Sequence, residues 1–207
     1  MKAVWYEQIG AADDVLTHGN IDDPEVSDGE ALVRIRTSGV NPSDVKTRAG
    51  ARGELQFPRI IPHSDGAGNI EAVGNGVDKN RIGERVWLWN GAFGRAFGTC
   101  AEYISLPANQ AVEMPENSTF EAGACMGIPA STAYHGVFSG GSVKNKTLLV
   151  TGGAGAVGHY AIQLAKWDGA QVITTVSGPE KGLAAKEAGA DLVVNYKTDD
   201  VVEAVND

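Results

Sequence analysis

Long apolar runs and cysteines are both scarce in this 207-residue chain. No run is long enough to span a bilayer, and the first ten residues carry Glu7 and lack the basic and apolar regions of a signal peptide. We therefore expect neither membrane insertion nor export. The two cysteines, Cys100 and Cys125, are far apart and form no CxxC pair, which disfavours a disulfide framework and a zinc knuckle. A reduced, cytoplasmic setting fits this cysteine content best.

Positive charge is also in short supply. Lys and Arg total 17 against 26 Asp and Glu, for a net charge of -9, and no basic cluster appears. Nucleic-acid binding depends on clustered cations that displace counterions, so no nucleic-acid partner is expected. The composition, 43% hydrophobic and 21% charged, is that of an ordinary globular protein and argues against disorder.

The first half of the chain is expected to be mostly β. Residues 31–36 (ALVRIR) alternate apolar and polar side chains as a half-buried strand does, and residues 85–89 and 101–106 resemble them. Turn-forming residues lie between these segments, at 41–43, 66–68 and 74–76.

The second half predicts strand and helix in strict alternation. Residues 147–151, 171–176 and 192–196 are expected as strands, and helices are expected after the first two. Pro179 suits the first turn of the second helix and Gly189 the position after its end, while Thr198 is expected to cap a third helix. This order predicts a parallel, doubly wound sheet with right-handed crossovers.

A glycine-rich loop, Thr151–Gly158 (TGGAGAVG), separates the first of these strands from its helix. A pyrophosphate needs bare backbone N–H groups and the positive end of a helix dipole. We therefore expect Gly152, Gly155, Ala156, Val157 and Gly158 to bind a dinucleotide cofactor. The alternative is that the glycines only form a tight turn.

The end of the second predicted strand bears on the choice between NAD and NADP. An acidic residue there would hydrogen-bond the ribose hydroxyl of NAD, but this chain has Ser177 followed by Lys181. A hydroxyl and an ammonium group suit a 2′-phosphate and favour NADPH. Glu180 lies close by, and Lys181 could equally be an ordinary surface lysine.

Four stretches carry a family resemblance: residues 38–44 (SGVNPSD), 62–68 (PHSDGAG), 127–134 (GIPASTAY) and the glycine loop. The chain resembles the medium-chain dehydrogenase/reductase superfamily, and within it the zeta-crystallin-like NADPH:quinone oxidoreductases. This resemblance implies a GroES-like domain at residues 1–120, a Rossmann domain at residues 121–207, and an active site in the cleft between them.

The zinc ligands of the alcohol dehydrogenases in this superfamily match Asn41, Ser64 and Cys125. A catalytic zinc needs about three ligands from Cys, His, Asp or Glu, and only Cys125 qualifies. Residues 89–103 also lack the cysteines of a structural zinc lobe. A site shifted from Ser64 to its neighbours His63 and Asp65 is disfavoured, because adjacent residues of an extended segment point to the face opposite that of residue 64. No metal is therefore expected.

Without zinc, hydrogen bonds must polarise the substrate carbonyl. The resemblance implies that Asn41 faces the substrate, that Thr132 lies by the nicotinamide, and that Tyr196 contacts the 2′-phosphate. The plainer alternatives are a turn former, a helix residue and a strand-end aromatic. Lys46 and Arg52 stand where some bacterial relatives carry aromatic residues, which weakens the case for a quinone.

Together these features predict a zinc-independent, NADPH-dependent reductase that transfers hydride to a quinone or an α,β-unsaturated carbonyl. The alternative is a non-catalytic, NADPH-binding protein of crystallin-like or regulatory type. A short-chain dehydrogenase is disfavoured because Ala156 replaces a glycine of that loop pattern and no YxxxK pair is present.

The second mononucleotide half of a Rossmann sheet is missing from the 207 residues. We therefore expect this chain to be part of a longer product and poorly active by itself. Members of the family are commonly dimers, so a homodimer of the full-length protein remains open.

Overall fold

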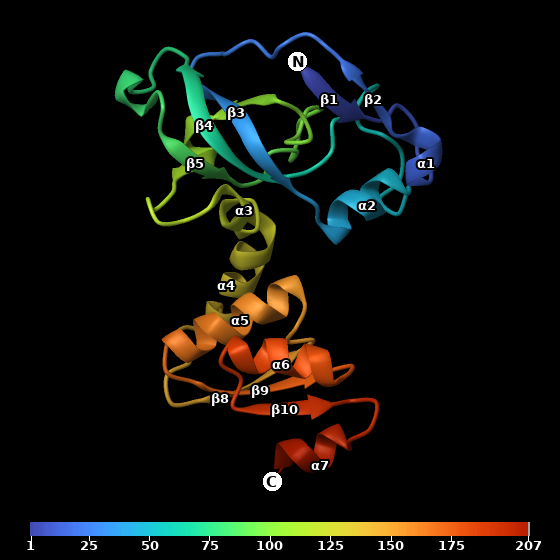
Figure 1. Ribbon diagram of the computed structural model, residues 1–207, viewed down its shortest axis with the longest axis vertical. Helices are drawn as coiled ribbons and strands as arrows, with labels where there is room; N and C mark the ends of the chain where they lie inside the picture. Colours follow the sequence, from blue (N-terminus) through green and yellow to red (C-terminus); the bar gives the residue numbers. More distant parts are fainter. Residues whose placement is uncertain (207) are drawn as a thin grey trace. The chain divides into compact units, whose positions relative to one another are not determined.

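A computed structural model describes residues 1–206. The chain divides into two compact units, residues 1–128 and 129–207 (Figure 1). The domain division that the sequence predicts, at residues 120 and 121, stays a prediction. No helix in the described residues is both long enough and apolar enough to cross a bilayer.

A five-stranded antiparallel sheet forms the centre of the first unit. Its strand order is β6-β3-β4-β5-β7. The strands are β3 (Glu30–Gly39), β4 (Asp65–Val73), β5 (Arg85–Leu88), β6 (Tyr103–Pro107) and β7 (Ala111–Glu113). All three strands predicted in this half are confirmed, with β6 beginning two residues later than expected. The alternating side chains point to opposite faces of the sheet. The apolar ones, Ala31, Val33, Val86 and Leu88, are therefore fully buried in one core cluster.

Smaller elements surround this sheet. A separate two-stranded sheet pairs β1 (Lys2–Trp5) with β2 (Thr17–Asn20). The helical elements are α1 (Ala12–Val15), α2 (Pro42–Arg48), η1 (Lys79–Arg81), η2 (Ala108–Gln110), α3 (Phe120–Gly123) and the π-helical turn η3 (Met126–Ala130). Between α2 and β4 the chain runs without regular helix or strand, and Ile60 anchors it through two backbone hydrogen bonds to Tyr6.

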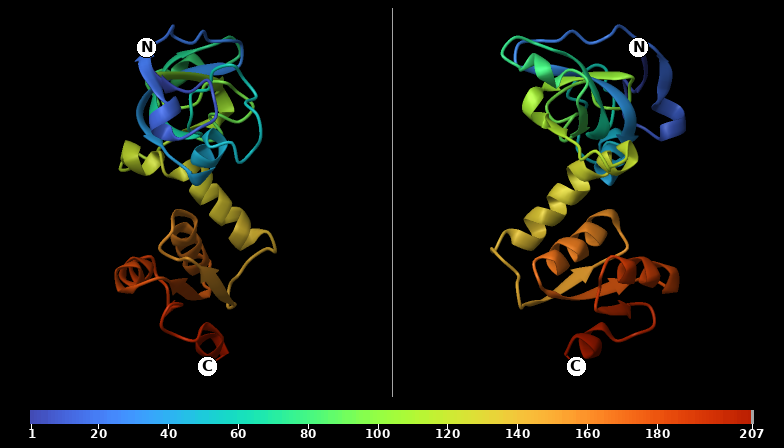
Figure 2. Two further views of the ribbon diagram at one scale, coloured as in Figure 1. Left: turned by 90° about the vertical axis from the view of Figure 1, so that its right-hand side faces the viewer. Right: turned by 60° about the vertical axis from the view of Figure 1, so that its left-hand side comes forward.

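The second unit is a three-stranded parallel sheet with order β10-β9-β8. The strands are β8 (Thr147–Thr151), β9 (Gln171–Val176) and β10 (Leu192–Asn195), and the helices are α4 (Ser131–Phe138), α5 (Ala156–Trp167), α6 (Pro179–Glu187) and α7 (Val201–Asn206). Helices α5 and α6 lie on one face of the sheet and α7 on the other (Figures 1 and 2). Both crossovers place their helix on the same face because the strands follow one another in a single direction across the sheet.

Burial within this sheet follows strand position. Every residue from Val172 to Val176 in the central strand β9 is buried. Strand β8 pairs only with β9, and its residues alternate between exposed and half-buried, with Leu149 47% exposed. Within the described residues of this unit, β8 is therefore paired on one side only, although its sequence is apolar.

The predicted helix ends are right for α6 and wrong for α7. Helix α6 begins at Pro179, and Gly189 follows its end with φ +107°. Helix α7 begins at Val201, where Asp200, and not Thr198, accepts hydrogen bonds from the N–H groups of residues 202 and 203. The Thr198 hydroxyl instead contacts Asp199 at 2.8 Å, which removes it from the capping position.

Candidate functional site

The glycine loop forms the turn between β8 and α5. Gly152 has φ +68°, a left-handed conformation that L side chains rarely adopt. Its N–H donates to the Thr175 hydroxyl at 3.2 Å, and its carbonyl accepts from the Gly155 N–H at 2.9 Å. The loop is thereby fixed to the end of β9 before any ligand binds.

Two other glycines allow the loop and helix to approach closely. A Cβ on Gly158 would lie 2.3 Å from the Gly152 carbonyl oxygen, so only glycine permits α5 to start this close to the strand. A Cβ on Gly153 would lie 2.1 Å from the Thr174 hydroxyl oxygen. The spacing of three in the sequence pointed to Gly158 but gave no sign of the role of Gly153.

Helix α5 offers free backbone donors at its beginning. Gly155 is the N-cap residue and makes no side-chain cap, and the first turn has no acidic residue. The first N–H groups of a helix have no partner within the helix, and they carry the positive end of its dipole. Ala156 and Val157 lie in this first turn and are exposed. The arrangement can accept a phosphate oxygen without displacing any side chain.

The residues predicted to select the cofactor lie beyond β9 and β10. The Lys181 Nζ lies 3.0 Å from the Ser177 Oγ, and Lys181 forms no ion pair within the described chain. The Tyr196 N–H donates to the Val176 carbonyl at 3.1 Å, and its side chain is 54% exposed. Parallel strands bring these residues and the glycine loop to one edge of the sheet. Thr132 is exposed in the first turn of α4, in the same unit.

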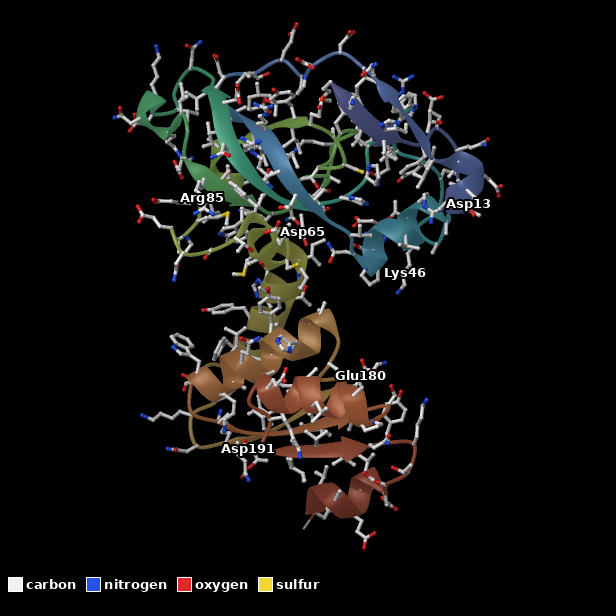
Figure 3. All side chains as sticks on the ribbon, viewed as in Figure 1. Asp13, Lys46, Asp65, Arg85, Glu180 and Asp191 are labelled. Carbon is white, nitrogen blue, oxygen red and sulfur yellow. The ribbon has the colours of Figure 1, made fainter. Side chains whose placement is uncertain are left out.

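Asn41 belongs to the first unit, where it is only 5% exposed. Its Nδ2 donates to Asp65 Oδ2 at 2.7 Å, and its backbone N–H donates to Asp44 Oδ2 at 2.8 Å. Sequence analysis considered Asp65 only as a disfavoured metal ligand and missed its contact with Asn41. Asp65 is the first residue of β4 (Figure 3) and is 1% exposed. Its carboxylate also accepts the Ile128 N–H at 2.9 and 3.0 Å. The turn expected at residues 66–68 is wrong, because these residues lie within β4, and the strand start at Asp65 was therefore not recognised.

Burial raises the pKa of Asp65 to about 6. The hydrogen bonds from Asn41 and Ile128 favour the charged form and oppose this shift, while the nearby carboxylate of Asp44 adds to it. Burial likewise raises the pKa of Asp44. Two carboxyl groups thus hold Asn41, one through its amide and one through its backbone.

The positions that match zinc ligands do not converge on a metal-binding set. The amide of Asn41 is bonded to Asp65, Cys125 is an exposed free thiol, and residues 1–206 contain no group of three or more His, Cys, Asp or Glu side chains suited to a metal ion. His63 is not extended as expected but has φ +78°. The His63 Nδ1 lies 2.9 Å from the Ser38 Oγ, whereas the Asp65 carboxylate accepts from Asn41. The two side chains therefore do not share a site.

A cavity of about 470 Å³ lies within the first unit, between α2 and the segments around residues 52–64 and 90–95. Its lining combines apolar groups such as Phe57 with the charged side chains of Asp44, Arg52 and Arg95. Asn41 does not line it, although Ser43 does. The Ser43 Oγ is buried without a hydrogen-bond partner in the described residues. The cavity is large enough for a small ring compound.

Two family models match the chain. Residues 27–116 match the alcohol dehydrogenase GroES-like domain, and residues 156–207 match the zinc-binding dehydrogenase family. A 2-methylene-furan-3-one reductase of Solanum lycopersicum is 32% identical over 95% of this chain and 52% of its own length. An alcohol dehydrogenase of Geobacillus stearothermophilus is 32% identical over 100% of this chain and 67% of its own length.

Solved structures of related oxidoreductases also resemble this chain. A quinone oxidoreductase of Pseudomonas syringae superposes with a TM-score of 0.87 at 30% identity, over 99% of this chain and 61% of that one. The quinone oxidoreductase of Escherichia coli in complex with NADPH gives 0.85 at 27% identity, over 98% of this chain and 61% of that one. The chain thus spans about half to two thirds of the length of these relatives.

These likenesses confirm the predicted fold class, a GroES-like antiparallel β part followed by part of a Rossmann sheet. They also agree with the family resemblance carried by the four sequence stretches. The chain belongs to the medium-chain dehydrogenase/reductase superfamily, and the relatives that it resembles include several named quinone oxidoreductase.

Proposed function

We propose that this chain binds NADPH through its second unit and serves a zinc-independent reductase that transfers hydride to a quinone or an α,β-unsaturated carbonyl. The observation that carries the proposal is the sheet edge described above. There, a phosphate loop with free helix N–H groups lies beside a Ser177–Lys181 pair, and no carboxylate ends β9.

The residues fit NADPH in their chemistry. The segment of Gly152, Gly155, Ala156, Val157 and Gly158 would hold the pyrophosphate. The first N–H groups of α5, from Ala156 to Gly158, would donate to it, and Gly152 and Gly155 present no side chain that obstructs its approach. When bound, NADPH supplies the hydride.

The 2′-phosphate would bind to Ser177, Lys181 and Tyr196. Lys181 is exposed and forms no ion pair within residues 1–206, so its ammonium group is available to an anion. The Escherichia coli and mycobacterial relatives whose structures contain NADPH support this choice of cofactor.

The substrate class is supported by the relatives named quinone oxidoreductase and by an NADPH-dependent alkenal/one oxidoreductase of Arabidopsis thaliana. Zinc-independence is supported by the donor set, because an amide at residue 41 and a hydroxyl at residue 64 are poor zinc ligands. In place of a metal, Asn41 would polarise the substrate oxygen by hydrogen bonding, and Thr132 would lie against the nicotinamide.

We also propose a cytoplasmic location, on the ground that both cysteines are free thiols. The division into a GroES-like domain at 1–120 and a Rossmann domain at 121–207, and a homodimer, remain part of the same proposal.

The cofactor assignment can be tested by titrating NADPH and NADH into the chain and following nicotinamide fluorescence. Lys181→Gln removes the proposed phosphate contact, and Lys186→Gln is the matched control because it removes an equal charge from an exposed site on the same helix. We expect tighter binding of NADPH than of NADH. Loss of one charge-assisted hydrogen bond, roughly 1.5 kcal/mol or more, should weaken NADPH binding about tenfold in Lys181→Gln.

NADH binding should be the same in all three proteins. Equal affinity for the two cofactors, or an equal effect of both substitutions, would refute the assigned 2′-phosphate site. Turnover with a p-quinone and with an enone, measured on the full-length protein with and without a chelator, tests the reaction. Cofactor binding without turnover on either acceptor would favour the non-catalytic NADPH-binding alternative.

A further inference from the structure

Asp65 is a buried carboxylate without a neutralising cation. None of the ion pairs found within residues 1–206 includes it, and it is only 1% exposed. Its charge is stabilised instead by N–H donors from Asn41 and Ile128. A buried charge of this kind is costly, so its partners must be arranged to accommodate it.

The carboxylate determines which way the amide of Asn41 faces. An ionised carboxylate can only accept hydrogen bonds, so the Nδ2 of Asn41, and not its Oδ1, must point toward Asp65. One Nδ2 hydrogen is used in that contact. The Oδ1 and the second Nδ2 hydrogen are then held in defined directions away from Asp65.

The surrounding backbone leaves little room for another arrangement. A Cβ on Gly127 would lie 2.2 Å from Asp65 Oδ1, so the chain packs directly against the carboxylate. The Thr99 hydroxyl donates to the Asp65 carbonyl at 2.6 Å and fixes the backbone. Asn41 is held at its own backbone by Asp44. Both partners of the Asn41–Asp65 hydrogen bond are therefore fixed independently of that bond.

We propose that Asp65 is a positioning residue in the reduction. It holds the Asn41 amide so that one N–H of Asn41 is directed at the substrate oxygen. This inference rests on the proposed function, in which Asn41 polarises that oxygen. Asp65 itself would touch neither substrate nor cofactor.

Substitution Asp65→Asn tests the orientation directly. The Ile128 N–H still needs an acceptor, so the new amide must offer it the Oδ1 and turn its NH₂ group toward Asn41. Asn41 then has to rotate its amide and present Oδ1 to residue 65. The fold keeps its hydrogen bonds, but the Asn41 Nδ2 moves to the position that Oδ1 held, so neither of its N–H groups keeps the original direction.

The first readout is the side-chain amide signal of Asn41 in ¹H–¹⁵N spectra of the full chain, assigned with Asn41→Asp. In the unmodified chain, we expect one proton of this amide to be protected and shifted by its carboxylate partner, and the signal to move when NADP⁺ and a p-quinone are added together. In Asp65→Asn the carboxylate shift should be absent. Thr99→Val is the control, because it weakens the same backbone segment without touching the carboxylate, and it should keep the shifted signal.

The second readout is turnover of the full-length protein, in which we expect Asp65→Asn to lower kcat about tenfold or more while leaving KM within about twofold. The exchanged pair, Asn41→Asp with Asp65→Asn, keeps the hydrogen bond with donor and acceptor exchanged, and it restores the net charge. It should keep the melting temperature of the unmodified protein but not its kcat, because residue 41 then offers no N–H.

If the exchanged pair had both the melting temperature and the kcat of the unmodified protein, the proposal would be overturned and Asp65 would have a purely structural role. An Asn41 amide signal that lacks the carboxylate shift, or that ignores the ligands, would overturn it as well. Absence of turnover in the unmodified full-length protein would count against the proposed function, whereas the amide signal would still decide the orientation.

Discussion

Replacing Asp65 by Asn should change how the stability of the protein depends on pH. Asp65 has a pKa of about 6 in the folded protein against an ordinary value of 3.8. The folded state therefore binds more protons than the unfolded state between these two values. Stability from this group is fully present below pH 3.8 and is lost as the pH rises through 6. The shift of about 2 units corresponds to about 3 kcal/mol.

The measurement is the free energy of unfolding, from urea titrations of the unmodified chain and of Asp65→Asn at several pH values from about 4 to about 7.5. Asparagine does not titrate, so the stability of the unmodified chain minus that of the variant isolates residue 65. We expect this difference to fall by about 2.5 kcal/mol from the lowest to the highest pH, because the unfolded carboxyl is already partly ionised at about pH 4. Asp44, whose pKa is also raised, is present in both proteins and largely cancels.

A difference that stays flat across this range would refute the reasoning, because it would mean that burial does not penalise the charge. A difference that grows with pH would mean that the hydrogen bonds from Asn41 and Ile128 outweigh burial and that the folded protein prefers the ionised form.

Four further predictions concern packing and hydrogen bonding. Gly158→Ala should weaken NADPH binding more than tenfold and lower the melting temperature, because its Cβ would lie 2.3 Å from the Gly152 carbonyl. Gly136→Ala in α4, where nothing lies within 4 Å of the added Cβ, should instead raise stability by about 0.5–1 kcal/mol and leave binding unchanged. Ile162→Ala should cost about 2–5 kcal/mol in urea unfolding, since Ile162 is fully buried, and a smaller loss would mean that the α5 core can collapse around the cavity. Thr99→Val should cost about 1–3 kcal/mol in the same assay, because the buried carbonyl that Thr99 serves loses its partner, and an unchanged stability would contradict that role.

The second unit was predictable because its signals are local. The strand 171–176 and the turn at Gly152 depend on neighbouring residues, so an apolar run and a glycine pattern were enough to place them. The start of α7 was misplaced because Thr198, Asp199 and Asp200 are all suitable caps in sequence, and only the actual hydrogen bonds distinguish them.

The sequence alone determined the alternation of strand and helix after residue 147, the glycine loop, the absence of a zinc-type ligand set at the matched positions, and the lack of a carboxylate after β9. The alternation, the loop and the strand end depend on residue types at short spacing, whereas the zinc-ligand comparison depends on the positions that the family resemblance matches. The tertiary structure alone decided that Asn41 is bonded to Asp65, 24 residues away, and that Ile128, 63 residues from Asp65, completes the contact. Burial of a carboxylate and the direction of an amide arise from segments that meet only in the folded chain, and no local pattern records them.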